Sequence, residues 1–195
     1  MRSAGRAGYT LVELLCATSL LLGLMAAAVP QATANLDEAR AAAAARHVAA
    51  RLRWARLEAT SDGASVGFSF EVVNGHYRFR AYVDRNGNGV RAREIDSGVD
   101  QPVAPADELA ALYSDTDFGL DASVPPVGAS APDGVSDPIR LGRTEILSLS
   151  PTGSATSGTL YVRTGRAQWA VRVLGATGRA RVLQYDRRTG AWRER

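Results

Sequence analysis

One acidic residue lies inside an apolar segment near the start of the chain. Glu13 is the only charged residue in the stretch LVELLCATSLLLGLMAAAV, which covers residues 11–29. A carboxylate in lipid is costly unless a cation pairs with it, so an ionisable group in such a segment is a functional-site hypothesis by default. A secretory signal peptide or an ordinary signal anchor would account for the apolar run but not for Glu13.

A second group of residues matches half of a calcium-binding loop. The pattern D-x-[DN]-x-[DN]-G supplies side-chain oxygens to Ca²⁺ in helix–loop–helix proteins, and its side chains here are Asp84, Asn86 and Asn88. The twelfth position should hold an acid but is Ile95, although acids flank it on both sides. Because a strand is also expected before the loop, we favour a turn in which Gly and Asn supply positive φ, with a metal site as the alternative.

The C-terminal residues carry a strong positive charge. Residues 151–195 hold nine arginines and two acids, a net charge of +7, whereas residues 61–150 have a net charge of −7. Guanidinium groups bind phosphates without sequence preference, and an aromatic ring can stack on a base. The candidates for binding double-stranded DNA are Arg179, Arg181, Arg187, Arg188 and Trp192. The alternatives are a solvated hairpin and ion pairs with the acidic middle of the chain.

The sequence contains no recognisable enzyme signature. Cys16 is the only cysteine, which excludes an internal disulfide and a cysteine-based metal site. The two histidines, His47 and His76, lie in different expected elements, and no P-loop pattern is present. We therefore expect a protein that is not an enzyme and needs no cofactor.

A single long helix is expected to carry the apolar segment. Residues 31–60 contain neither Gly nor Pro and are rich in alanine, the best helix former. We predict one helix over residues 10–60, bent near Pro30. Residues 9–30 are long and apolar enough to cross a membrane or lie in a filament core. Residues 31–60 would pack on a sheet through a stripe made of Ala41, Ala45, Val48, Leu52 and Ala55.

From residue 61 onward the pattern is that of strands. Apolar residues alternate over 66–72 and 77–83 on either side of Asn74-Gly75, which predicts a β-hairpin. Residues 97–138 are rich in Pro, Gly, Asp and Ser, which predicts a long exposed loop. Further strands are expected at 139–149, 159–162, 168–174 and 180–185. One long helix followed by mainly antiparallel strands gives an α+β fold.

The stretch GYTLVELL resembles the class III signal of type IV pilins and type II secretion pseudopilins. In that family a prepilin peptidase cleaves after the glycine, here Gly8, and methylates the new N-terminal residue, here Tyr9. Phenylalanine is commoner there, so Tyr9 departs from the pattern while keeping an aromatic ring. The fifth mature residue of the family is a glutamate, here Glu13, which pairs with the N-terminal amine of the neighbouring subunit. The resemblance thus implies a leader peptide over 1–8 and an assembly role for Glu13.

The chain as a whole is similar to the GspH/FimT family of minor pseudopilins and minor pilins. The similarity rests on the signal, the long helix, the D-x-N-x-N-G turn, "LSPTG" before a strand and a late "GRAR". It implies a helix packed on two antiparallel sheets. It also implies a single-pass protein of the inner membrane whose residues 61–195 form a β-rich domain in the periplasm.

The resemblance leaves two functions open. The first, which we favour, is a minor pseudopilin that helps to initiate the filament tip of a type II secretion system. Its partners would be other pilin subunits, the prepilin peptidase, the inner membrane and secreted proteins. The second is a minor pilin that binds double-stranded DNA in natural transformation through G-R-x-R, here Gly178, Arg179 and Arg181.

Overall fold

Helix α1 (Leu11–Asp62) is the longest element of the computed structural model, which describes residues 8–142 and 145–195. The chain divides into two units, residues 1–36 and residues 37–195, and α1 contributes to both. The helix continues through Pro30 without interruption. This confirms the predicted long helix, with an end two residues beyond the predicted one; the bend near Pro30 stays a prediction.

In the first unit the apolar side chains of α1 that the structure describes are exposed. The large apolar residues between Leu11 and Met25 are all exposed. By length and composition this helix could cross a membrane. At its start the Thr10 hydroxyl accepts a hydrogen bond from the Glu13 amide at 3.2 Å, which satisfies a free N–H of the first turn.

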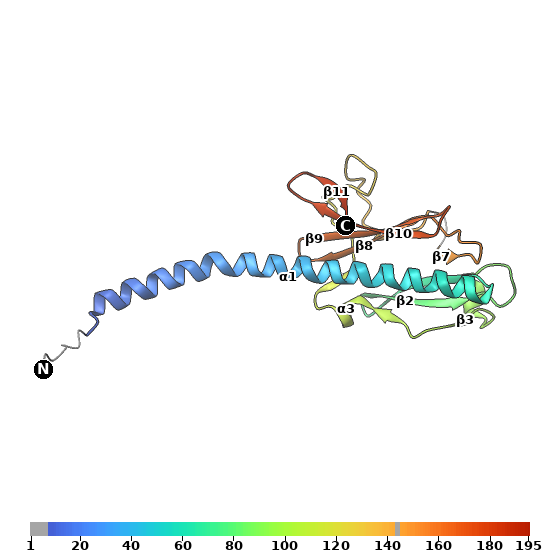
Figure 1. The fold of residues 1–195 in the computed structure, drawn as a ribbon, viewed down its shortest axis with the longest axis horizontal. Helices are drawn as coiled ribbons and strands as arrows, with labels where there is room; N and C mark the ends of the chain where they lie inside the picture. The colour runs from blue at the N-terminus through green and yellow to red at the C-terminus, as the bar shows by residue number, and fades with distance from the viewer. Residues whose placement is uncertain (1–7, 143–144) are drawn as a thin grey trace, which may run out of the picture. The chain divides into compact units, whose positions relative to one another are not determined.

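In the second unit two antiparallel sheets enclose the rest of α1, as Figure 1 shows. The first sheet has the order β3 (Gln101–Pro102), β2 (His76–Val83), β1 (Val66–Val73) and β7 (Ile146–Leu149), and β4 (Asp107–Glu108) also pairs with β2. The second has the order β11 (Ala191–Glu194), β10 (Arg179–Asp186), β9 (Ala167–Leu174), β8 (Gly158–Thr164) and β5 (Thr116–Phe118), and β6 (Ile139–Arg140) also pairs with β8. Two short helices connect strands: α2 (Ala92–Asp96) lies between β2 and β3, and α3 (Leu109–Leu112) lies between β4 and β5.

The alanine-rich half of α1 forms the centre of the core. The predicted stripe is buried, and it is joined by side chains of both sheets, among them Phe68, Phe79, Leu147, Leu160 and Val171. Glu38 ties the helix to the second sheet, because its Oε1 accepts the Trp169 indole N–H and the Gln184 amide N–H, each at 2.7 Å. The predicted packing of the apolar stripe on a sheet is thus confirmed for Ala41–Ala55, with two sheets instead of one, whereas residues 31–36 are exposed.

The predicted hairpin is also present. Val73 pairs with His76, and Asn74 and Gly75 both have positive φ, 53° and 84°. This is the backbone of a type I′ turn, which matches the twist of the flanking strands.

Two predictions about the middle of the chain are wrong. Residues 97–138 are not one exposed loop, since β3, β4, α3 and β5 lie within them and Leu109 and Phe118 are buried. These elements are two to four residues long, too short to produce a period in the sequence. The single strand expected over 139–149 is two strands in different sheets, since β6 pairs with β8 and β7 pairs with β1.

Candidate functional site

The N-terminal candidates lie on the exposed part of the first unit. Tyr9 and Glu13 are both exposed, and a side chain added at Gly8 would meet no other atom within 4 Å. Within residues 8–142 and 145–195, no ion pair involves Glu13. Residues 1–7 of the predicted leader lie outside the described residues. Among the described residues the exposed Glu13 carboxylate thus has no cationic partner.

The D-x-N-x-N-G segment forms a turn, as predicted, but only its glycines have positive φ, so the expectation that Asn86 and Asn88 also supply it is wrong. Asp84 is buried, and its Oδ1 accepts the amide N–H groups of Asn86 at 3.1 Å and Gly87 at 2.8 Å. Its Oδ2 accepts the amide N–H of Gly89 at 2.6 Å. Gly87 and Gly89 have φ of 78° and 86°, a conformation that other residues adopt at a cost. One carboxylate thus organises six residues of backbone after β2.

The two short motifs "LSPTG" and "GRAR" meet each other in space. A Cβ atom added to Gly178 of "GRAR" would lie 2.7 Å from the carbonyl oxygen of Gly153 in "LSPTG". It would also lie 3.5 Å from the Cδ and Nε atoms of Arg56 on α1. The turn between β9 and β10 therefore packs on the loop between β7 and β8, above the Arg56 side chain. Gly178 has a packing role whatever the following arginines do.

The arginines after Gly178 lie on the outer face of the second sheet. Ala180 and Val182 pack against the core, so Arg179 and Arg181 point to the opposite face, and both are exposed. Arg181 is directly opposite Arg172 of β9, which is exposed as well. We call Arg172, Arg179 and Arg181 the basic row.

The basic row is weakly neutralised. The side chains of Arg181 and Glu194 are 3.3 Å apart and more than half exposed, a geometry that contributes little free energy. Arg172 and Arg179 have no ion pair in the described part of the chain. Sequence reasoning missed Arg172, although its place between the buried Val171 and Val173 signals an outward side chain.

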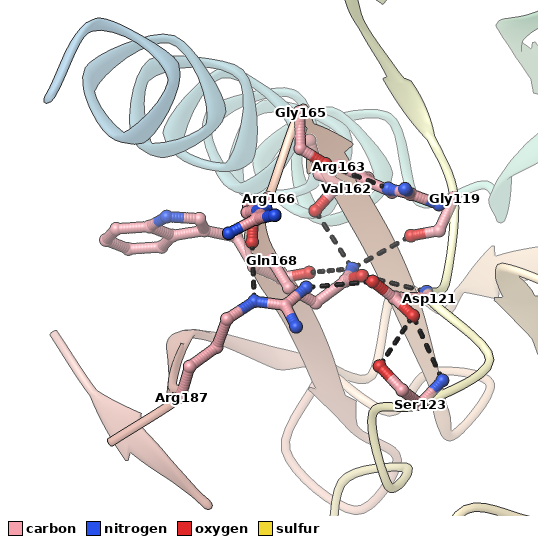
Figure 2. A network of polar contacts seen from close by, with 10 residues as sticks. Gly119, Asp121, Ser123, Val162, Arg163, Gly165, Arg166, Gln168 and Arg187 are labelled. Atoms are coloured by element: carbon pink, nitrogen blue, oxygen red, sulfur yellow. Dashed lines mark hydrogen bonds and ion pairs between the residues drawn. The ribbon is translucent and has the colours of Figure 1, made fainter. Parts of the chain in front are cut away.

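Arg187, in contrast, is held by its own chain. Figure 2 shows its guanidinium on Asp121, with Nη2 2.8 Å from Oδ2, while Nε donates to the Arg166 carbonyl at 2.9 Å. The Ser123 amide N–H, and after it the Arg187 guanidinium, hold the pKa of the Asp121 carboxyl well below its usual range. The Asp121 amide in turn donates to Gln168 Oε1 at 3.0 Å. Arg187 thus fastens the segment after β5 to the strands and turn beneath it.

Trp192 is also engaged within the protein, whereas the Arg188 side chain has no polar contact in the described part of the chain and only its amide N–H donates, to Asp186 Oδ1 at 2.9 Å. The indole N–H of Trp192 donates to the Pro125 carbonyl at 2.8 Å, and its ring centroid lies 5.7 Å from Tyr161 and 5.3 Å from Tyr185. Stacking on a base would require the ring to leave these contacts. The Arg188 side chain is exposed. The structure thus divides the predicted set into the exposed arginines Arg179, Arg181 and Arg188, of which Arg181 has one exposed ion pair with Glu194, and the engaged pair Arg187 and Trp192.

Comparison with known families finds a match that lies within the second unit. A family model described as "Type II transport protein GspH" matches residues 44–178, more than half of the chain. The chain belongs to the GspH family. The sequence resemblance is therefore confirmed, as is the fold that it implies. Searches of curated proteins and of solved structures find no significant match.

The boundaries of the GspH match separate the candidate sites. The matched region contains most of the second unit and ends at Gly178, the first residue of G-R-x-R. Gly8, Tyr9 and Glu13 precede it, and Arg179 and Arg181 follow it. Family membership supports a pseudopilin-like role in type II secretion and association with other pseudopilins in a filament. With the apolar α1 it fits a single-pass protein of the inner membrane.

Proposed function

We propose that this protein is a minor pseudopilin that helps to initiate the filament tip of a type II secretion system, with no catalytic role. The observation that carries the proposal is the GspH match over residues 44–178, in a chain whose preceding helix is apolar enough to span a membrane. The arginines of residues 1–8 would keep that end in the cytoplasm by the positive-inside rule, and the second unit would then lie in the periplasm. There it would contact secreted proteins.

Maturation begins, in this proposal, with cleavage after Gly8 by a prepilin peptidase and methylation of Tyr9. Support comes from the exposure of this segment and from the absence of a side chain at Gly8, which lets the backbone enter a protease site. Gly8→Val should abolish cleavage in cells that contain the peptidase, while Gly5→Val in the same leader should not. Intact mass measures both. Normal cleavage of Gly8→Val would exclude this processing site.

Assembly depends, in this proposal, on Glu13. Its exposed carboxylate has no ion pair among the described residues, and an unpaired charge in lipid is costly. The N-terminal amine of a neighbouring subunit would supply the missing cation. Glu13→Gln keeps the size of the side chain and removes its charge. We expect this variant to be cleaved normally but poorly incorporated, as measured by cross-linking to the other pseudopilins, and wild-type incorporation would rule out the pairing.

One observation favours a second function, the binding of double-stranded DNA by a minor pilin. The basic row places three exposed guanidinium groups on neighbouring strands, where they could contact a phosphate backbone. The full chain in detergent micelles would be titrated with duplex DNA at several salt concentrations. Arg179→Ala with Arg181→Ala is compared with Arg85→Ala and Arg93→Ala, an equal charge change at exposed positions on the D-x-N-x-N-G turn and on α2.

The salt dependence separates the two functions. If the basic row binds DNA, the Arg179/Arg181 variant should lower the slope of log affinity against log salt by about 2, since each phosphate contact contributes about 0.9. The Arg85/Arg93 variant should leave the slope unchanged. Absence of binding by the wild type at low salt would eliminate the DNA-binding alternative and leave the secretion role.

A further inference from the structure

The segment between β2 and β3 buries two carboxylate oxygens that no donor reaches. Asp100 is 1% exposed, and its Oδ1 has no hydrogen-bond partner among the described residues. The same holds for the buried Oε2 of Glu94. A buried acceptor without a partner loses its hydration and gains nothing in return, so such atoms are rare in folded proteins. These two oxygens need a donor or a cation.

Both carboxylates lie against the D-x-N-x-N-G turn. The other oxygen of Asp100, Oδ2, accepts the Arg91 amide N–H at 3.0 Å. The other oxygen of Glu94, Oε1, accepts the Asn88 side-chain amide at 2.8 Å. The two acids are therefore fixed beside residues 88–91, although Asp100 lies sixteen residues after Asp84 in the sequence.

The acids of this segment have no ion-pair partner among the described residues, although Arg85, Arg91 and Arg93 lie in the same stretch of sequence. Asp84, Glu94 and Asp100 form no ion pair in the described part of the chain, although Asp84 and Asp100 are both buried. The nearby guanidinium of Arg91 donates to the Asn88 carbonyl at 3.0 Å and so does not pair with these acids. Unpaired charges inside a protein are strongly unfavourable unless a counter-ion accompanies them.

We propose that the segment from Asp84 to Asp100 binds one Ca²⁺ ion, with Glu94 Oε2 and Asp100 Oδ1 among its ligands. No set of three or more Asp, Glu, His or Cys side chains converges in the described part of the chain. The remaining ligands are therefore amide and main-chain oxygens of the turn, with water. Ca²⁺ takes six to eight oxygens in flexible geometry, whereas Mg²⁺ requires a near-ideal octahedron and Zn²⁺ prefers nitrogen and sulfur.

The site also supplies a candidate for the acid that the sequence pattern lacks. A helix–loop–helix calcium site takes its last carboxylate from the twelfth position, which is Ile95 here. The fold brings Asp100 to the turn instead, because β3 returns antiparallel to β2 immediately after it. With two carboxylate ligands in place of the usual larger number, we expect a dissociation constant of about 10⁻⁴ to 10⁻³ M.

The test is calcium-dependent thermal unfolding of the full chain in detergent, after treatment with a chelator and dialysis. At ten times the dissociation constant, CaCl₂ should raise Tm by about 3–6 °C. MgCl₂ at the same ionic strength should give a clearly smaller shift. Calorimetric titration with CaCl₂ should show one site per chain.

Variants assign the ligands. Asp100→Asn and Glu94→Gln should each lose the calcium-dependent shift in Tm. If the Asp100 variant does not fold, the variant of the half-buried Glu94 still tests the site. Asp96→Asn is the matched control, because Asp96 is an exposed acid in the same segment. The proposal is overturned if the wild type shows neither a shift nor binding heat, if Mg²⁺ gives an equal shift, or if Glu94→Gln keeps the full shift.

Discussion

Replacing Gly178 with alanine tests whether the glycine of G-R-x-R serves packing. Two costs add at this position. The backbone has φ of +59°, which costs a residue with a Cβ atom about 1–2 kcal/mol. The new Cβ atom would lie 2.7 Å from the Gly153 carbonyl oxygen, and such overpacking costs about 1–3 kcal/mol. We expect Gly178→Ala to lower the free energy of unfolding by about 2–5 kcal/mol.

A matched control separates the two costs. Gly190, in the turn between β10 and β11, has φ of +65°, but a Cβ atom there would meet only the Tyr185 hydroxyl, at 3.9 Å. Gly190→Ala should therefore carry the backbone cost alone, about 1–2 kcal/mol. Thermal unfolding of the full chain in detergent measures both, at about 2–4 °C per kcal/mol for a unit of this size. Equal Tm values for the two variants would refute the packing role of Gly178.

The packing role of Gly178 also limits what a loss of DNA binding in a Gly178 variant can show. A Gly178 variant that binds DNA less well would show only that the turn before Arg179 has moved. The substitutions of Arg179 and Arg181 leave that turn intact, so they are the informative ones.

Three further outcomes follow from contacts in the second unit. The pKa of Asp121 is depressed in the folded state, so the stabilising effect of its carboxylate is present above about pH 4 and is lost as the pH falls through the folded pKa. The difference in Tm between wild type and Asp121→Asn should therefore be largest near pH 7 and shrink in acid. Glu38→Ala leaves the donors of Trp169 and Gln184 without their acceptor and should cost about 2–4 kcal/mol in urea unfolding, whereas a loss below about 0.5 kcal/mol would contradict the anchoring role. Leu147→Ala, at a fully buried position, should cost about 2–5 kcal/mol by the same method, and an unchanged urea midpoint would contradict the core assignment.

Some features of this protein are encoded within short stretches of sequence. The alanine-rich segment determines the helical conformation of α1, and Asn74-Gly75 determines the hairpin and its register. The D-x-N-x-N-G turn forms from hydrogen bonds between residues at most five apart. In each case the decisive interaction is local, so the pattern of residue types is enough to predict it.

The features that define the candidate sites are not local. The Arg187 contact with Asp121 joins residues sixty-six apart, and the packing of Gly178 on Gly153 joins two loops. The position of Asp100 against the turn depends on β3 pairing with β2 through two residues each, which leaves no period in the sequence. The sequence by itself therefore determined the long helix, the hairpin and the family, whereas the processing segment stays a prediction. Only the tertiary structure decided which arginines are exposed and which buried carboxylate oxygens lack a hydrogen-bond partner among the described residues, because both depend on which distant segments the packing of α1 between two sheets brings together.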